Sequence, residues 1–185
     1  KEPQLKIMGI EAVKSSTPAP CRQKIKDALK IIMSGDEKML NTFIQKFREE
    51  FMELPPEDVA YPRSLNGLSK FTSSDSLFAK GAPIHVKGGI LYNHLVKKHK
   101  LGNKYPYIQE GDKIKFLHLK LPNIYQSSAM SFITKLPKEL DFHKIIDYNV
   151  QFEKSFVEPL KFITDKILWR IDDSYGTQGT LEDFF

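Results

Sequence analysis

Lysines dominate the middle of this 185-residue chain. Between positions 80 and 120 there are nine lysines but only two acidic residues, Glu110 and Asp112. The nine are Lys80, Lys87, Lys97, Lys98, Lys100, Lys104, Lys113, Lys115 and Lys120. Ammonium groups at this density can neutralise the phosphates of a nucleic acid and release their counterions, although lysines also cover ordinary solvated surfaces. Tyrosines and glycines interleave them, which favours a folded basic surface and an anionic partner.

The last eight residues form a second candidate binding element, with the spacing Q-x-x-L-x-x-F-F. Its defined positions are Gln178, Leu181, Phe184 and Phe185. One helical turn would bring the leucine and the phenylalanines to one side as an apolar plug, with the glutamine amide beside it. Burying each plug residue in a partner would contribute about 1.5–3 kcal/mol. The alternative is that the phenylalanines pack on the protein's own core, but the acidic, glycine-containing stretch before them favours a partner.

The totals limit the class of protein. Apolar residues make up 41% of the chain, the net charge is +5 and the sequence pI is about 9.1, so we expect a folded domain that favours an anionic partner. Cys21 is the single cysteine, which excludes an internal disulfide and a thiolate metal cluster. No run of 18 apolar residues is present, so we expect no membrane span. The chain begins at Lys1 without an initiator methionine, and we expect a piece of a longer polypeptide.

The hydrophobic periodicity predicts the elements that must carry these residues. Alternating patterns predict strands at 5–11, 113–119 and 129–133. Spacings of three and four predict a helix from 20 to 33 and a second one carrying the apolar residues from 39 to 51. They also predict a short helix at 65–71 and longer ones at 84–99, 142–154 and 156–169. The stretch 62–82 is otherwise expected to be irregular. The predicted fold is therefore α+β and predominantly helical, with a small β element.

Hydroxyl residues predict where three of the helices begin. Ser15, Ser16 and Thr17 precede Pro18, which favours a hydroxyl cap at the first helix. Ser34 with Glu37, and Ser155 with Glu158, have the spacing of capping boxes.

Three other patterns resemble catalytic or metal sites, and we do not assign them. Asp172 and Asp173 follow a predicted helix and precede the tail, so solvated acids are expected. His94 and His99 have a zinc-finger-like spacing but no cysteine pair accompanies them. The stretch 87–89, KGG, is too short for a nucleotide-binding loop.

Several blocks, in order along the chain, are similar to one known family. The first is 5–11, LKIMGIE, followed by 15–18, SSTP. The later blocks are 83–88, PIHVKG; 111–116, GDKIKF; 136–139, LPKE; and 152–160, FEKSFVEPL. In these blocks the chain resembles the palm-to-thumb junction and the thumb of replicative family B DNA polymerases of tailed bacteriophages. The resemblance implies a predominantly helical α+β thumb with a small β element and an N-terminal strand from the palm.

The resemblance also implies residue roles. Near the new primer end it places Lys6, Lys14, Ser15, Ser16 and Thr17. Phosphate contact by backbone amides at a helix start is implied for Ser64, Leu65 and Asn66. Contacts with backbone phosphates along the thumb are implied for Lys87, Lys97, Lys98 and Lys115. The C-terminal positions Gln178, Leu181, Phe184 and Phe185 resemble a PIP-type peptide that binds sliding clamps.

Domain limits and partners follow from the same resemblance. It implies the palm end at 1–17, the thumb at 18–170 and a flexible acidic tail with the clamp peptide at 171–185. The implied partners are primer–template DNA, a sliding clamp and the remaining palm, fingers and exonuclease portion, with no membrane, in the cytoplasm of an infected bacterial host. Family B catalysis uses two palm aspartates with two magnesium ions and a fingers lysine, and those motifs do not occur here. We therefore expect Mg²⁺ in the complete polymerase, no cofactor in this chain and no polymerase activity from this chain alone.

Two other hypotheses remain. A non-enzymatic, clamp-associated DNA-binding adaptor would explain the basic middle and the tail equally well, but not the block at 5–11 or the order of the blocks. A nuclease would need clustered acids on a strand or helix to hold metal, and the sequence offers none.

Overall fold

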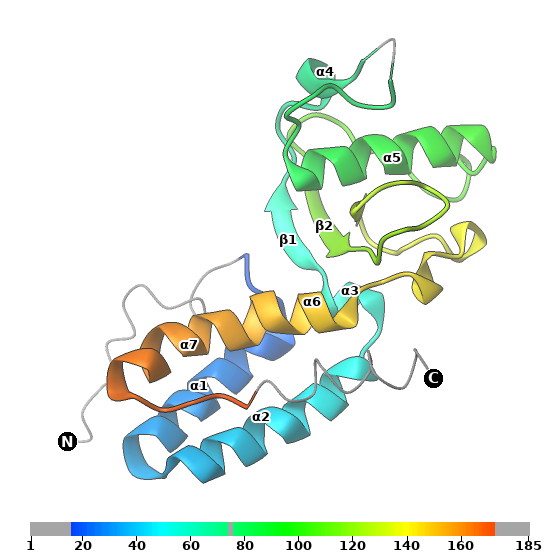
Figure 1. Cartoon of the computed structure of the whole chain (residues 1–185). Coiled ribbons are helices and arrows are strands. Elements are labelled where there is room, and N and C mark those ends of the chain that lie inside the picture. The colour runs from blue at the N-terminus through cyan, green and yellow to red at the C-terminus, as the bar shows by residue number, and fades with distance from the viewer. Residues whose placement is uncertain (1–15, 74–75, 173–185) are drawn as a thin grey trace. The chain divides into compact units, whose positions relative to one another are not determined.

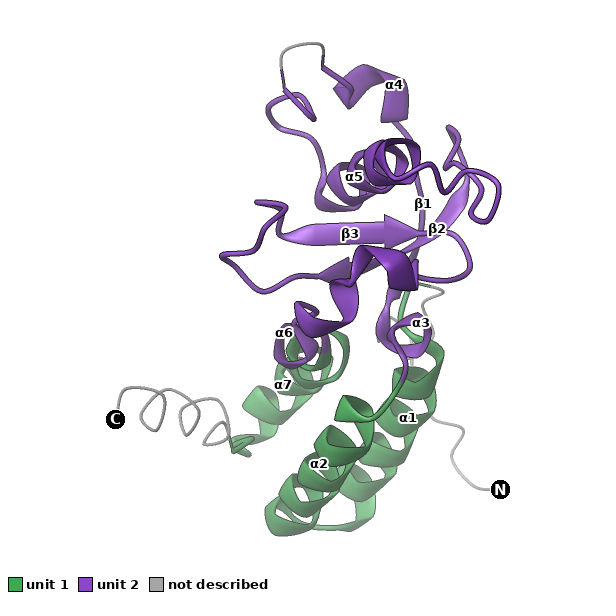
Figure 2. Cartoon of the chain, turned by 90° about the vertical axis from the view of Figure 1, so that its right-hand side faces the viewer, with its two compact units in different colours: residues 1–54, 152–185 green, residues 55–151 purple. Residues whose placement is uncertain are grey.

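The computed structural model describes residues 16–73 and 76–172, which divide into two compact units (Figures 1 and 2). Unit 1 takes in residues 1–54 and 152–185, and unit 2 takes in residues 55–151. Helices predominate and one small antiparallel sheet is present, which confirms the predicted α+β class. The strand predicted at 5–11 and the terminal peptide at 178–185 lie outside the described residues.

Unit 1 contains a hairpin of two long helices, α1 (Ala19–Ser34) and α2 (Glu37–Met52). Both were predicted from their apolar spacing, and each buries one face. Ile25 and Leu29 of α1 and Phe47 of α2 are among the residues that fill this core. The two helices pack against each other, as expected for helices joined by so short a turn.

The predicted hydroxyl caps of these helices are wrong. At α1 the N-cap position is Pro18 rather than a hydroxyl residue, and Pro18 makes no side-chain cap hydrogen bond. At α2 the cap is Asp36, whose carboxylate accepts the backbone N–H of Met39 at 2.8 Å. The Ser34 hydroxyl instead donates to the carbonyl of Lys30 at 2.8 Å, because it still belongs to the last turn of α1, where a serine can bond back to the preceding turn.

The later part of unit 1 is one continuous helical segment rather than two capped helices. A π-helical turn, η4 (Glu153–Val157), leads into α7 (Glu158–Thr164) and the 3-10 turn η5 (Asp165–Ile167). Ser155 is buried inside the π turn and makes no cap, so the capping box predicted with Glu158 is wrong. Aromatic packing accounts for the burial, since the rings of Phe156 and Phe47 lie 4.8 Å apart.

Unit 2 is built on a three-stranded antiparallel sheet in the order β1-β2-β3. The predicted strands at 113–119 and 129–133 are confirmed as β2 (Lys113–His118) and β3 (Ala129–Phe132). The edge strand β1 (Tyr61–Ser64) was missed. It lies in a stretch expected to be irregular, because it has four residues, contains a proline and shows no alternation of apolar and polar residues.

The helices of unit 2 are mostly short, apart from α5 (Ile84–Lys98). The others are α3 (Pro56–Val59), α4 (Leu68–Phe71), η2 (Lys138–Leu140), η3 (Phe142–Lys144) and α6 (Tyr148–Phe152), which ends at the boundary between the units. The helix predicted at 142–154 is therefore wrong over its first part, where the 3-10 turn and an isolated β-bridge between Ile146 and Leu119 precede α6. Helix α5 lies across one face of the sheet and packs mainly on β3 (Figure 2). It carries Lys87, Lys97 and Lys98, three of the nine central lysines.

Candidate nucleic-acid interface

Helix α5 presents a basic side to solvent because its other side is buried on the sheet. Val86, Leu91 and Leu95 are buried, and two glycines allow the helix to approach the strands closely. On the opposite side, His94 and Lys98 are exposed and Lys87 is half-buried. Spacings of seven and four residues place these three on one stripe of a helix.

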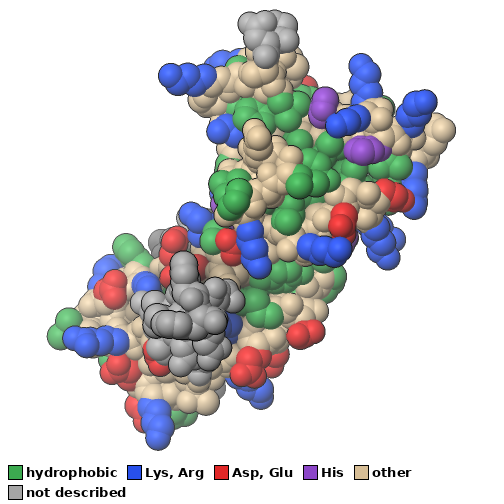
Figure 3. Space-filling model, turned by 45° about the vertical axis from the view of Figure 1, so that its right-hand side comes forward, with side chains coloured by type: hydrophobic (Ala, Val, Ile, Leu, Met, Phe, Trp, Pro, Cys, Tyr) green, Lys and Arg blue, Asp and Glu red, His purple; other side chains and the backbone are tan. Residues whose placement is uncertain are grey.

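The stripe has dimensions that suit a nucleic-acid backbone. Its ends, Lys87 and Lys98, are eleven residues apart, or about 16 Å at the rise of an α-helix, which matches roughly five base pairs of duplex. Lys97 is also exposed and stands three residues after His94. We call these four residues, Lys87, His94, Lys97 and Lys98, the α5 stripe. Figure 3 shows basic and histidine side chains around an apolar part of the surface of this unit.

The lysines of β2 do not join the α5 stripe. Ser131 faces α5, since its hydroxyl donates to the carbonyl of His85 at 2.8 Å, and Phe116 is its cross-strand partner. Lys113 and Lys115 alternate with the residues on that face and so point to the other side of the sheet. The ammonium of Lys115 donates to the carbonyl of Glu57 at 3.0 Å, so this predicted phosphate ligand already has a structural partner.

Lys104 is engaged by an ion pair. Its ammonium contacts the Glu139 carboxylate, which also accepts the Tyr105 hydroxyl at 2.7 Å. These hydrogen bonds, first that from Lys104, lower the pKa of Glu139 to about 2. The same pair raises the pKa of Lys104. Of the nine lysines, this one is already neutralised by an acidic partner.

The predicted phosphate-binding amides at 64–66 have a different environment from the one expected. The N–H of Leu65 donates to the carbonyl of Asp112 at 2.8 Å, and its side chain is buried. The helix start lies just beyond, at α4, where Glu110 accepts the N–H groups of Gly67 and Leu68, the latter at 2.8 Å. The Gly67 amide is the main cause of a lowered Glu110 pKa. The amides at the start of α4 are therefore bound by the protein's own carboxylate, and phosphate contact at 64–66 stays a prediction.

The flanking members of that stretch, Ser64 and Asn66, are exposed. At the junction, Ser16 is half-buried and Thr17 is buried. The other predicted primer-end residues and the clamp positions lie outside the described residues; they are Lys6, Lys14, Ser15, Gln178, Leu181, Phe184 and Phe185.

Arg63 is a cation that sequence reasoning missed. It is exposed on β1, on the sheet face that α5 covers, and its guanidinium carbon lies 5.9 Å from the centre of the Phe116 ring. Burial, and secondarily the charge of Arg63, lowers the pKa of His85 near the start of α5. An alternating pattern in the strand would have pointed to this residue, but Pro62 interrupts it.

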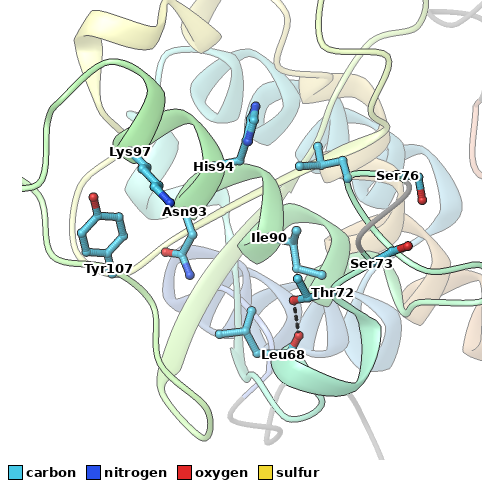
Figure 4. A pocket seen from close by; sticks show the side chains of 10 residues that line it. Leu68, Thr72, Ser73, Ser76, Ile90, Asn93, His94, Lys97 and Tyr107 are labelled. Carbon is cyan, nitrogen blue, oxygen red and sulfur yellow. Dashed lines mark hydrogen bonds between the residues drawn. The ribbon is translucent and has the colours of Figure 1, made fainter.

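A pocket of about 680 Å³ opens beside the α5 stripe (Figure 4). Asn93, Lys97 and the ring of Tyr107 lie on one side of it, and Ser73 and Ser76 on the other. The full lining is Leu68, Thr72, Ser73, Ser76, Leu77, Ile90, Asn93, His94, Lys97 and Tyr107. The α5 members recur at spacings of three and four, so they share one side of the helix. None of these ten residues, all in the described part of the chain, is acidic.

Metal binding and membrane insertion find no support in the described part of the chain. Within residues 16–73 and 76–172, no three His, Cys, Asp or Glu side chains are grouped so that they could hold a metal ion. No helix in the same residues has the length and apolar character needed to cross a bilayer.

Two curated proteins are similar to the chain, and both are described as DNA-directed DNA polymerases. The protein from Enterobacteria phage T4 is 29% identical over 163 residues, which covers 86% of this chain and 18% of the relative. The protein from Escherichia phage RB69 is 31% identical over 190 residues, which covers 100% of this chain and 20% of the relative. The chain thus spans about a fifth of the length of the curated relatives it matches. No protein-family model matches it.

Proposed function

The chain is a relative of phage DNA-directed DNA polymerases, and we propose that it is the thumb of such an enzyme, gripping primer–template duplex through the α5 stripe. The observation that carries the proposal is the segregation of α5 into a side buried on the sheet and a basic side facing solvent. Because the sheet supports the helix, the backbone positions of these side chains are held at fixed spacing, while each lysine ammonium can adjust to a phosphate on its flexible stem. Likeness to two polymerases favours nucleic acid among the anions that could bind there.

The proposed grip is electrostatic and independent of base sequence. Lysine ammonium groups contact phosphates as point charges, and phosphate contacts position a protein on DNA without distinguishing bases. A replicative thumb needs this property, because it must hold every sequence that the enzyme copies. Arg63 and the exposed residues Ser64 and Asn66 belong to the same unit and extend the polar surface available to the backbone.

We extend the proposal to the terminal peptide, which tethers the enzyme to a sliding clamp. Its support is the spacing of Gln178, Leu181, Phe184 and Phe185 at the end of an acidic stretch. A plug of three apolar side chains gives a contact of moderate strength, and linkage to the DNA grip raises the effective affinity of the assembly. Replacing Leu181 and both phenylalanines by alanine is expected to abolish clamp binding and leave duplex affinity unchanged.

Catalysis is proposed to reside outside this chain. The palm, fingers and exonuclease portion would supply the aspartates, the magnesium ions and the nucleotide-binding lysine, and this chain alone would be inactive. We place the assembly in the cytoplasm of an infected bacterium. The proposed division of labour is tested by mixing this chain with the remaining polymerase, with and without clamp, and measuring product length. Distributive synthesis with an intact tail would refute the tether.

The DNA grip is tested by the salt dependence of duplex binding. Neutralisation of about three phosphates predicts that affinity falls roughly forty-fold between about 50 and 200 mM salt. Fluorescence anisotropy with a labelled primer–template measures this slope directly. Equal affinity at the two salt concentrations would refute the proposal.

A clamp-associated DNA-binding adaptor is the second candidate function. It shares the α5 stripe and the terminal peptide, so binding assays do not separate the two. The parent gene and its neighbours do: an aspartate-bearing palm upstream or next to this sequence supports the thumb, and its absence from both supports the adaptor.

A further inference from the structure

The pocket beside the α5 stripe combines an exposed aromatic ring with a cation, and this pair of groups matches the two halves of a nucleotide. Tyr107 is 44% exposed although its neighbour Ile108 is buried. Lys97 lines the same pocket and has no ion-pair partner among residues 16–73 and 76–172. We propose that the pocket binds one unpaired nucleotide of the DNA held by this unit, with the base against Tyr107 and its phosphate at Lys97. This inference rests on the proposed function and adds a ligand to it.

The Tyr107 ring is held in place by backbone contacts on both sides of it. The Asn93 side chain donates to the carbonyl of Ile108 at 2.9 Å and accepts the N–H of Ile108 at 2.8 Å. One residue earlier on α5, the Tyr92 hydroxyl donates to the carbonyl of Pro106 at 2.8 Å. Both polar groups of Asn93 are therefore used in fixing the segment that carries Tyr107.

The ring also lies close to the backbone at Gly102, where an added side chain would be in tight contact with it. A β-carbon at Gly102 would lie 3.2 Å from two atoms of the Tyr107 side chain. The ring is thus supported by the 102 turn and anchored to α5 by the backbone of its neighbours. A ring held in this way is preorganised for stacking, because little conformational entropy remains to be lost when a flat ligand binds.

The Lys97 ammonium favours an anionic ligand. Lys97 is the cation among the ten lining residues that the structure describes, and none of those ten is Asp or Glu. Ser73 and Ser76 lie on the side opposite Lys97 (Figure 4). The Ser76 hydroxyl donates to the carbonyl of Phe78 at 2.8 Å, and its oxygen can still accept a hydrogen bond from a sugar hydroxyl or a base edge. Apolar side chains, including Ile90, form the surface between these polar groups. An amphipathic anion with a flat apolar part fits this combination.

The nucleotide must be unpaired for the ring to reach it. Bases inside a duplex stack on one another, whereas bases of a single strand offer a face on which an aromatic side chain can stack. The pocket volume of about 680 Å³ falls in the range of small-ligand sites. The α5 stripe shares Lys97 with the pocket, so a duplex on the stripe would bring a frayed end or an overhanging nucleotide close to Tyr107.

Three labelled duplexes test the inference with the full 185-residue chain. One is blunt, one has a single dT overhang and one has an abasic overhang, which keeps the phosphate and removes the base. We expect the dT overhang to bind about ten-fold more tightly than the abasic one, as base–aromatic stacking predicts. Equal affinity for the two overhangs would overturn the inference while leaving the duplex grip intact.

Two substitutions of Tyr107 assign the effect to the ring. Tyr107→Ala is expected to remove the difference between the dT and abasic overhangs, and Tyr107→Phe to retain it, with blunt-duplex affinity unchanged in both. An unchanged preference for dT in the alanine variant would overturn the assignment. Failure of all three duplexes to bind the unsubstituted chain would instead overturn the proposed function, and with it this inference.

Discussion

Gly88 of α5 lies directly against Ser131 of β3. A β-carbon at Gly88 would be 2.7 Å from the backbone nitrogen of Ser131 and 2.6 Å from its hydroxyl oxygen. That hydroxyl donates to the carbonyl of His85, one turn earlier on α5. The position of the α5 stripe over the sheet therefore depends on a glycine that allows contact and on a serine that fixes it.

Substituting Gly88 by alanine is expected to destabilise unit 2. The added methyl meets strand backbone, which cannot rotate away, so α5 must move off β3 at a cost of about 1–3 kcal/mol. This exceeds the gain of about 0.5–1 kcal/mol from replacing a helical glycine. Urea denaturation followed by circular dichroism measures the change, and a Gly88→Ala variant as stable as the parent would contradict the packing described.

Gly89→Ala provides the matched comparison. Its nearest neighbour is a terminal methyl carbon of the Leu65 side chain, which can move more easily than backbone. We expect a smaller loss of stability than at Gly88, and we expect Leu65→Ala to be less costly in the Gly89→Ala background than alone, since the two residues then no longer compete for space. Additive effects in this double-mutant cycle would show that the methyl group is accommodated elsewhere.

Replacing Lys97 and Lys98 together by alanine is expected to weaken duplex binding and flatten its salt dependence. Each lost phosphate contact reduces the magnitude of the slope of log affinity against log salt by about 0.9. The slope of the double variant should therefore be smaller in magnitude by up to about 1.8. Both lysines are in the last turn of α5, where cations also favour the helix dipole. A melting curve of the variant is therefore needed to show that the fold is retained.

Lys113→Ala is the control for this pair. The residue is an exposed lysine of the same unit, but it lies on the opposite side of the sheet from α5. It removes one unit of net charge, as each single α5 substitution does, and is expected to leave the slope almost unchanged. Equal losses from Lys113→Ala and from either α5 lysine would show that binding follows net charge rather than the α5 stripe.

Glu110 is expected to titrate below its ordinary value while it caps α4. Backbone N–H groups, first that of Gly67, stabilise the Glu110 carboxylate and lower its pKa from 4.5. The cap therefore stabilises the folded state fully at pH values above 4.5, and this stabilisation is lost as the pH falls through the lowered pKa. The amide proton shifts of Gly67 and Leu68 in NMR spectra should follow this titration. In Glu110→Gln the same amides should not titrate. A midpoint at or above 4.5 in the parent would refute the cap.

The long elements of this fold could be predicted from the sequence because their burial is periodic. Helix α5 was expected at 84–99 and spans Ile84–Lys98, since its apolar residues outweigh the low helix propensity of two glycines. Caps were less predictable. Ser34 and Asp36 compete for the same helix start, and only the position where α1 ends decides that Asp36 becomes the cap.

The candidate site was only partly predictable, for a related reason. The lysines of α5 could be identified from spacing, but the side of the sheet to which Lys115 points depends on the pairing register of β2 and β3. Glu110 and Gly67 are 43 residues apart in sequence, and no local pattern indicates their contact. Tyr107 is exposed because Asn93 binds the backbone next to it, which a linear pattern does not reveal either.

Asn41 of α2 anchors the segment that leads to the terminal peptide. Its side chain donates to the carbonyl of Arg170 at 2.8 Å and accepts the N–H of Asp172 at 2.8 Å, while Glu37 accepts the N–H of Arg170 at 3.0 Å. Ile171, between them, is buried.

Asn41→Ala removes two of these hydrogen bonds, each contributing about 0.5–1.5 kcal/mol, so the segment should open more often. Trypsin should then cleave after Arg170 several-fold faster than in the parent. Thr42→Ala, which removes only a bond to the Lys38 carbonyl, is the control and should not accelerate cleavage. A protease cleaves the open state in proportion to its population, so the cleavage rate reports how often the segment opens. Equal rates in the Asn41→Ala variant and the parent would therefore show that the anchor does not hold this segment.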